Sequence, residues 1–122
     1  MHVQFAELPV HDQDRAKSFY VEKLGLSVAA DVPMGEGGWR WIELKADGAQ
    51  TAIHFTRRAD DAASEEPTMV LIDDDVAATV GALRKNSVEI ISEPGPAPYD
   101  PSLTVAAFRD SEGNYMILSS GG

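Results

Sequence analysis

Residues 5–26 have the sequence FAELPVHDQDRAKSFYVEKLGL, and this stretch decides the fold that we expect. Its first six residues alternate with the period of two that separates the two faces of a strand. Apolar residues then recur at helical spacing, with Asp12 or Asp14 placed to cap the helix and Gly25 placed to end it in the left-handed conformation. The stretch therefore predicts a strand, a turn and a helix in immediate succession.

A weaker copy of this pattern begins at residues 68–72, an apolar run that predicts a strand. The aspartates that follow can cap a second helix, and Val76, Val80 and Leu83 would form its buried stripe before it ends near Asn86. A pattern that recurs in this way indicates two similar modules.

Each half continues with three more predicted strands, which gives each module the order strand, helix, strand, strand, strand. We expect an α+β fold in which two βαβββ modules form a curved mixed sheet with outer helices. The modules would span residues 1–57 and 67–120 of a single domain, 1–122, and the polar residues between them would be a linker. The expected strands are residues 5–10, 26–32, 39–46, 50–56, 68–72, 88–92, 103–109 and 114–119.

Glycine, proline and aspartate mark the expected turns and loops. An Asp-Gly pair at 47–48 predicts a hairpin, and residues 110–114 predict a turn built on an Asx motif with a residue at positive φ. Residues 93–101 contain four prolines, which lack the amide donors of a sheet, so we expect a loop with Tyr99 as its only aromatic residue. The glycine-rich residues 33–38 predict a loop that either closes over a pocket or is a plain connector.

Composition narrows the class of protein. The chain has 122 residues, 43% of them hydrophobic, which suits one domain with a real core. It has no cysteine, which excludes disulfides, thiolate metal sites and cysteine nucleophiles. The net charge of −10 disfavours nucleic-acid and membrane partners, and it either favours a cationic small molecule or serves solubility alone. We find no signal-peptide pattern and no apolar stretch near the roughly 20 residues of a bilayer span, so we expect a cytoplasmic protein.

Two motifs at opposite ends of the chain resemble those of a known family. Residues 10–25 carry the order Val-x-Asp, Ala, Phe-Tyr, Leu-Gly, and residues 108–114 have the sequence FRDSEGN. These motifs resemble the opening and closing patterns of the vicinal oxygen chelate superfamily of glyoxalases, extradiol dioxygenases and bleomycin-resistance proteins. Residues 33–35 with Arg40-Trp41 look like an uncharacterised, glyoxalase-like bacterial branch. The resemblance covers nearly the whole chain and implies paired βαβββ modules in a homodimer.

The resemblance also implies a divalent metal, held in the family by His, Glu or Gln at four inward strand positions. Those positions correspond here to Phe5, His54, Thr68 (or its neighbour Pro67) and Ile117, of which only His54 can bind a metal. Glu7 shares a strand face with Phe5 and could add a second ligand, but catalytic metal sites commonly need three protein ligands. We therefore expect no cofactor, with a divalent metal as the disfavoured alternative.

Glu7 and His54 are the predicted catalytic residues. A carboxylate that faces a cleft must be solvated or paired, and a pair with His54 would form an acid–base couple. His54 could instead anchor a ligand by a hydrogen bond, or be a buried and satisfied histidine. The alternatives remain open at this point.

Aromatic and apolar side chains are the predicted ligand-binding residues. Trp39 and Trp41 lie two residues apart on one strand, where they could stack on a flat or cationic ligand or be buried in the core or a dimer contact. The full set is Phe5, Trp39, Trp41, Tyr99, Tyr115 and Ile117.

These residues allow three functions. The first is metal-independent binding of a small, cationic or aromatic molecule, which resembles the bleomycin-resistance branch. The second is a lyase or isomerase of the glyoxalase type, with His54 and Glu7 as acid and base or as partial metal ligands. The third is a degenerate module whose sheet face only mediates association.

Overall fold

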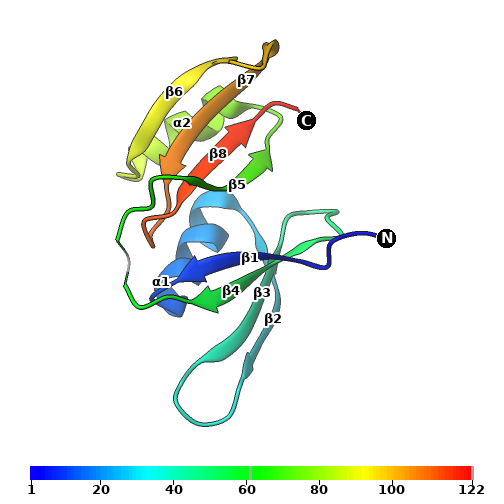
Figure 1. Ribbon diagram of the computed structural model, residues 1–122, viewed down its shortest axis with the longest axis vertical. Helices are drawn as coiled ribbons and strands as arrows, with labels where there is room; N and C mark the ends of the chain where they lie inside the picture. Colours follow the sequence, from blue (N-terminus) through cyan, green and yellow to red (C-terminus); the bar gives the residue numbers. More distant parts are fainter. Residues whose placement is uncertain (61, 122) are drawn as a thin grey trace. The chain divides into compact units, whose positions relative to one another are not determined.

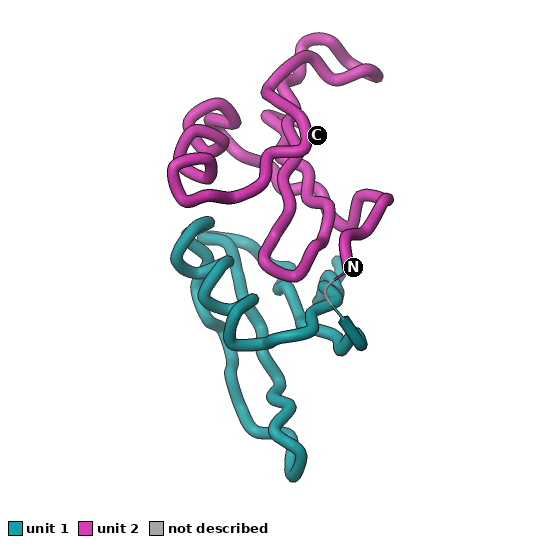
Figure 2. Tube along the Cα trace, turned by 90° about the vertical axis from the view of Figure 1, so that its left-hand side faces the viewer, with its two compact units in different colours: residues 1–61 teal, residues 62–122 magenta. Residues whose placement is uncertain are grey.

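A computed structural model describes residues 1–60 and 62–121. The chain divides into two compact units, unit 1 (Met1–Asp61) and unit 2 (Ala62–Gly122), which are coloured separately in Figure 2. Asp61 of the predicted linker and Gly122 lie outside the described residues. That residues 1–122 act as a single domain stays a prediction.

The two units have the same topology, and the strands of each lie side by side in Figure 1. The strand order is β1-β4-β3-β2 in unit 1 and β5-β8-β7-β6 in unit 2, and in each the first strand is parallel to the last. This arrangement confirms the predicted α+β class with two βαβββ modules. The elements of unit 1 are β1 (Phe5–Val10), α1 (Gln13–Ser18), η1 (Phe19–Lys23), β2 (Ser27–Pro33), β3 (Arg40–Lys45) and β4 (Ala52–Arg57). Those of unit 2 are β5 (Pro67–Ile72), α2 (Val76–Lys85), β6 (Ile90–Ala97), β7 (Asp100–Arg109) and β8 (Tyr115–Ser119).

The helical segment of unit 1 begins as the predicted α-helix and then continues as a π-helix. The Asp12 side chain accepts a hydrogen bond from the Arg15 backbone N–H at 3.1 Å, which makes Asp12 the cap. From Phe19 the helix widens into the π-turn η1, which the sequence pattern did not predict. The wider turn leaves Phe19 and Tyr20 both buried, with their rings edge to face. Gly25 then has a φ of 73°, as expected of the residue that ends the helix.

The helix of unit 2 agrees with its sequence pattern. Asp75 caps α2 by accepting a hydrogen bond from the Ala78 backbone N–H at 3.0 Å. The predicted stripe of Val76, Val80 and Leu83 is buried, with each side chain at most 3% exposed. Burial of one apolar stripe is what holds a short helix against its sheet.

The prediction of a loop at residues 93–101 is wrong, because most of these residues belong to strands. β6 continues through Pro94 and Pro96 to Ala97, and only Pro98 and Tyr99 form the turn before β7 begins. β6 is the edge strand of its sheet, so amide groups on its outer side need no partner, and its pairing with β7 is interrupted by register shifts. Prolines are tolerated at such edges, and they also hinder pairing with another chain.

The closing turn of unit 2 is the predicted Asx turn. Asp110 Oδ1 accepts hydrogen bonds from the backbone N–H groups of Glu112 and Asn114 at 2.8 and 2.9 Å. The Asn114 side-chain amide donates to Asp110 Oδ2 at 3.0 Å, and Gly113 has a φ of 81°. The turn is therefore fixed by one buried carboxylate.

The length and hydropathy of the helices indicate whether any of them could span a membrane. Among the described residues, no helix is both long enough and apolar enough to span a bilayer.

Candidate functional site

The sheet of unit 1 has one face against its helical segment and one face that carries polar and aromatic side chains. Leu8, Ile42, Leu44 and Phe55 are fully buried on the helical side. Strand alternation turns their neighbours in sequence to the opposite face. Four of these neighbours, with Phe5 from the same face of β1 as Glu7, form what we call the His54 cluster, which consists of Phe5, Glu7, Trp41, Glu43 and His54.

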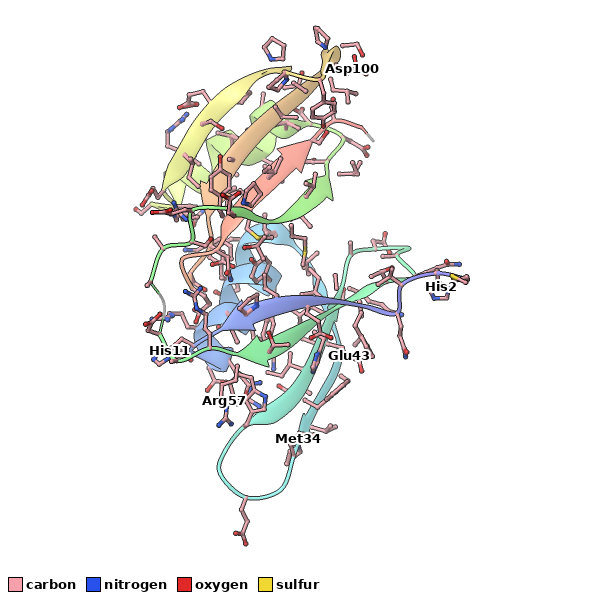
Figure 3. All side chains as sticks on the ribbon, in the orientation of Figure 1. His2, His11, Met34, Glu43, Arg57 and Asp100 are labelled. Atoms are coloured by element: carbon pink, nitrogen blue, oxygen red, sulfur yellow. The ribbon has the colours of Figure 1, made fainter. Side chains whose placement is uncertain are left out.

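Strand register brings the two predicted catalytic residues together. Glu7 of β1 is the parallel partner of His54 of β4, and Glu43 of β3 is its antiparallel partner. Two carboxylates therefore flank one imidazole on three adjacent strands. Figure 3 labels Glu43 on this sheet.

The rings of the cluster are in contact. The ring centroids of Trp41 and His54 are 3.9 Å apart, with 32° between the ring planes. Phe5 lies 5.7 Å from both Trp41 and His54, edge-on to the indole. The 5.7 Å separations are those of favourable aromatic pairs, and Trp41 and His54 are closer still, so the three rings form one continuous surface.

Hydrogen bonds orient the polar groups of the cluster. His54 Nδ1 lies 2.7 Å from Glu7 Oε2, and the Trp41 indole N–H donates to Glu43 Oε2 at 2.6 Å. The Glu7 side chain is 52% exposed and that of His54 is 12% exposed. When Glu7 is ionised and His54 is neutral, the carboxylate can only accept, so Nδ1 carries the proton of this pair and Nε2 is left as the acceptor. The imidazole can therefore accept either a proton or a hydrogen bond at Nε2.

A shallow hollow adjoins the cluster at the start of β1 and β4. It has a volume of about 540 Å³, and its lining includes Phe5, Glu43 and Lys45. An apolar ring beside a carboxylate at the edge of an open hollow suits a ligand with a flat apolar part and a positive charge.

Trp39 lies apart from these ring contacts. β3 begins at Arg40, so Trp39 precedes the strand on which it was predicted to lie. The Arg57 guanidinium carbon lies 4.6 Å from its ring centroid. The structure thus joins Trp41, and not Trp39, to the rings of Phe5 and His54.

The other predicted ligand-binding residues belong to unit 2. Tyr99 is 74% exposed on the turn between β6 and β7. Tyr115 begins β8 beneath the guanidinium of Arg109, at 5.6 Å from ring centroid to guanidinium carbon. Ile117 is paired with Val70 of β5 and Ala107 of β7. Their role as ligand-binding residues stays a prediction.

The side chains at the family's metal-ligand positions do not fit a metal ion. Phe5 and Ile117 have no donor atom, and Pro67 has none in its side chain. Within residues 1–60 and 62–121, no three His, Asp or Glu side chains are grouped so as to hold a metal. His54 and Glu7 together provide two donor residues where catalytic sites commonly use three, and Glu43, whose carboxylate accepts from the Trp41 indole, is not grouped with them as a third.

Sequence reasoning placed Glu43 on the correct face but did not assign it to the site. The signal was present in the alternation of Trp41 and Glu43, which predicts that the indole N–H and the carboxylate lie on one side of β3. The contact itself depends on side-chain rotamers, which alternation does not determine.

The repeated strand order, with polar and aromatic residues on one sheet face, places this chain in the class of proteins built from two βαβββ units. Comparison with known families identifies the class further. The chain belongs to the glyoxalase/bleomycin resistance protein/dioxygenase superfamily, whose family model matches residues 2–118. The predicted resemblance is thereby confirmed.

Several relatives share most of the chain. The uncharacterized protein YetH of Bacillus subtilis (strain 168) is 33% identical over 111 residues, which cover 89% of this chain and 89% of YetH. TnmS3, an antibiotic binding protein from Streptomyces sp. CB03234, is 31% identical, and its crystal structure matches with a TM-score of 0.79 over 97% of this chain and 93% of TnmS3. A superfamily member from Sphaerobacter thermophilus DSM 20745 is 25% identical, with a TM-score of 0.81 over 98% of this chain and 96% of that protein.

Proposed function

We propose that this protein binds a small molecule with a planar, positively charged aromatic part, and that it does so without a metal ion. The observation that carries the proposal is the contact of Trp41 with His54 and Phe5, beside the carboxylates of Glu7 and Glu43. Family membership and the antibiotic-binding relative TnmS3 support a small-molecule ligand. By analogy with that relative, an antibiotic is one candidate for the ligand.

The chemistry of the His54 cluster favours a cation over a neutral ligand. A cation over a tryptophan ring gains roughly 0.5–2 kcal/mol, depending on how far it is desolvated. Glu7 remains half exposed and Glu43 has one oxygen outside its bond to the indole, so each can receive a positive group. The net charge of −10 raises the local concentration of cations around the chain.

The absence of a metal requirement is part of the proposal. The donor set described above supplies two residues, and the positions that would complete a family-type site carry Phe5, Thr68 (or Pro67) and Ile117, none of which is the His, Glu or Gln that the family uses. We expect no change in melting temperature on addition of divalent ions, since a ligand that binds only the folded state raises that temperature.

A fluorescence titration tests the proposed ligand class. We expect N-methylquinolinium to quench tryptophan emission in a saturable way, and its neutral counterpart quinoline to bind more weakly. Trp41→Leu should weaken binding about tenfold or more, because it removes the stacking surface. Glu22→Gln is a matched control for loss of an acidic side chain, since Glu22 is exposed on η1 outside the cluster. A lack of saturable quenching by any planar cation would contradict the proposal.

A second candidate function rests on the Glu7–His54 hydrogen bond. An imidazole oriented by a carboxylate can remove a proton from carbon next to a carbonyl, which is the step that a glyoxalase-type lyase or isomerase needs. Exchange of that proton with D2O, followed by NMR on small α-hydroxy ketones, would detect this activity. Glu7→Gln should slow the exchange, whereas exchange no faster than in buffer would exclude this function.

We also propose a homodimer located in the cytoplasm. Exposed apolar side chains on strands support association, among them Val28 and Val32 of β2 and Val70 and Ile72 of β5. Light scattering coupled to size exclusion would test the dimer, and a mass of 13.1 kDa in solution would contradict it.

A further inference from the structure

A second hollow of unit 1 lies at the carboxyl ends of β1 and β4, beside the glycine-rich loop. Its volume is about 560 Å³, and Gly37, Gly38, Trp39, Arg40, Arg57 and Arg58 are among the residues that line it. Figure 3 shows His11 and Arg57 at this end of the sheet. Arg57 follows His54 by three residues on β4, which is roughly 10 Å along a strand. The hollow is therefore distinct from the His54 cluster.

The lining of this hollow is rich in arginine for a chain whose net charge is −10. It includes the arginines 40, 57 and 58 and the aspartates 12 and 14. Asp31 and Asp60 pair with Arg40 and Arg58 from outside the lining, so the attraction of the hollow for an anion depends on the arginine that no carboxylate of the described residues balances. Such an arginine on a strongly acidic protein attracts anions where the rest of the surface repels them.

Arg40 is not available to a ligand. Its guanidinium donates to Asp31 at 2.8 Å and to Asp14 at 2.7 Å. The hydrogen bonds with Asp31 and Asp14 raise the pKa of Arg40. This residue therefore shapes the wall of the hollow but has its charge balanced within unit 1.

Arg57 is the charged group that remains available. Its guanidinium stacks on Trp39, and among the described residues no carboxylate forms an ion pair with it. A guanidinium whose face lies on an aromatic ring keeps its N–H groups pointing outward in its own plane. That fork matches the two oxygens of a carboxylate.

The backbone around Trp39, whose ring lies beneath Arg57, is held by hydrogen bonds. The buried Gln13 side chain donates to the Arg40 carbonyl at 2.6 Å and accepts from the Arg40 backbone N–H at 2.9 Å. The Trp39 carbonyl accepts a hydrogen bond from the Met34 backbone N–H at 3.3 Å, which closes the glycine-rich loop. The backbone that carries the Trp39 ring is thus held at two points before any ligand arrives, which lowers the entropic cost of binding.

Arg58 lies beside Arg57 in the lining and already has a charged partner. Its guanidinium forms an ion pair with the exposed carboxylate of Asp60 at 3.7 Å. Its backbone is fixed next to β1, because its N–H donates to the Val10 carbonyl at 3.0 Å.

From these observations we propose that Arg57, with the ring of Trp39, forms an oxyanion-binding site for small organic carboxylates. Phosphate is also negatively charged and can also present two oxygens to a guanidinium, so it is the alternative ligand for this site. The site is independent of the proposed cation site, and each can fail without the other.

An NMR titration of the full chain tests the site. Sodium benzoate and sodium phosphate are added separately at constant ionic strength, with sodium chloride as the reference, while the Arg57 Nε–H and Trp39 indole N–H signals are followed. We expect saturable shifts of both signals with benzoate and weaker or no saturation with phosphate. Tighter binding of phosphate than of benzoate would overturn the carboxylate assignment. Shifts no larger than those caused by chloride would overturn the site itself.

Two arginine variants separate this site from general charge effects. Arg57→Gln should weaken benzoate binding about tenfold or more, since a bidentate charged contact is lost. Arg84→Gln removes an arginine of unit 2 that pairs with Glu93, and it should leave benzoate binding unchanged. Circular dichroism should show that both variants are folded. If the Trp39 signal of folded Arg57→Gln still shifts and benzoate binds as tightly as to the unmodified chain, the proposal is wrong.

Discussion

Unit 1 and unit 2 share a strand order and differ in the sheet face turned away from the helix. In unit 1 that face carries the charged and aromatic His54 cluster. In unit 2 the corresponding alternation presents Val70, Ile72 and Ile117, with Tyr115 under Arg109 at one end, opposite the buried Met116 and Leu118. The helical side of each sheet is fixed by the need to bury a core, whereas the other side can change without loss of the fold. The carboxylate–imidazole pair and its ring cluster therefore lie on one copy of a repeated scaffold.

The two cores should contribute equally to stability. Phe55 in unit 1 and Phe108 in unit 2 are both fully buried. Replacement of either by alanine should lower the free energy of unfolding by about 3–5 kcal/mol, because it creates a cavity. Urea denaturation measures both variants. A loss below about 1 kcal/mol in one of them would show that the units do not have equivalent cores.

The two hairpin turns should differ in their sensitivity to loss of an aspartate. Asp110 accepts three hydrogen bonds in the turn of unit 2, so Asp110→Ala should cost about 2 kcal/mol of unfolding free energy. Asp47 occupies the corresponding turn of unit 1, and no hydrogen bond of its side chain is found among the described residues. Asp47→Ala should therefore change stability by about 0.5 kcal/mol or less. Equal losses in chemical denaturation would contradict this distinction.

A partly buried ion pair should make unit 1 more sensitive to pH than the exposed pair of unit 2. Hydrogen bonds from Arg40 and Lys17 lower the pKa of Asp31 from its ordinary 3.8. A lowered pKa in the folded state means that the stabilisation is present above pH 3.8 and is lost as the pH falls through the folded-state pKa. Asp31→Asn should cost about 1 kcal/mol at pH 7, and the difference from the unmodified chain should shrink in acid.

Glu93 supplies the control for this experiment. It pairs with Arg84 on the exposed surface of unit 2, so Glu93→Gln should change stability by about 0.5 kcal/mol or less at pH 7. Thermal melts across the acid range would compare the two variants. A pH-independent effect of Asp31→Asn would contradict the ion-pair account.

Local sequence signals were sufficient for most of the fold. The capping aspartates and the Val76, Val80 and Leu83 stripe predicted α2, and alternation predicted the strands of both units. The extent of β6 could not be predicted, because a proline is compatible with a strand only at a sheet edge, and edge position is a property of the tertiary fold. The π-turn η1 depends in the same way on how Phe19 and Tyr20 pack against the sheet.

The candidate site was only partly accessible to sequence reasoning. Alternation placed Glu7 with Phe5 on one strand face and His54 on the corresponding face of another strand. The register of β1 on β4 then made them partners, and register is set by the whole sheet. Arg57 was missed because its stacking partner Trp39 lies just outside β3, where alternation no longer applies.

Calorimetric titration with a planar aromatic cation in the presence of a chelator tests the central claim most directly. We predict saturable binding that the chelator leaves unchanged, that weakens about tenfold or more in Trp41→Leu, and that persists in Ile72→Ala of unit 2. Binding that disappears when divalent ions are removed, or that is equally strong in Trp41→Leu, would contradict a metal-independent site on the sheet of unit 1.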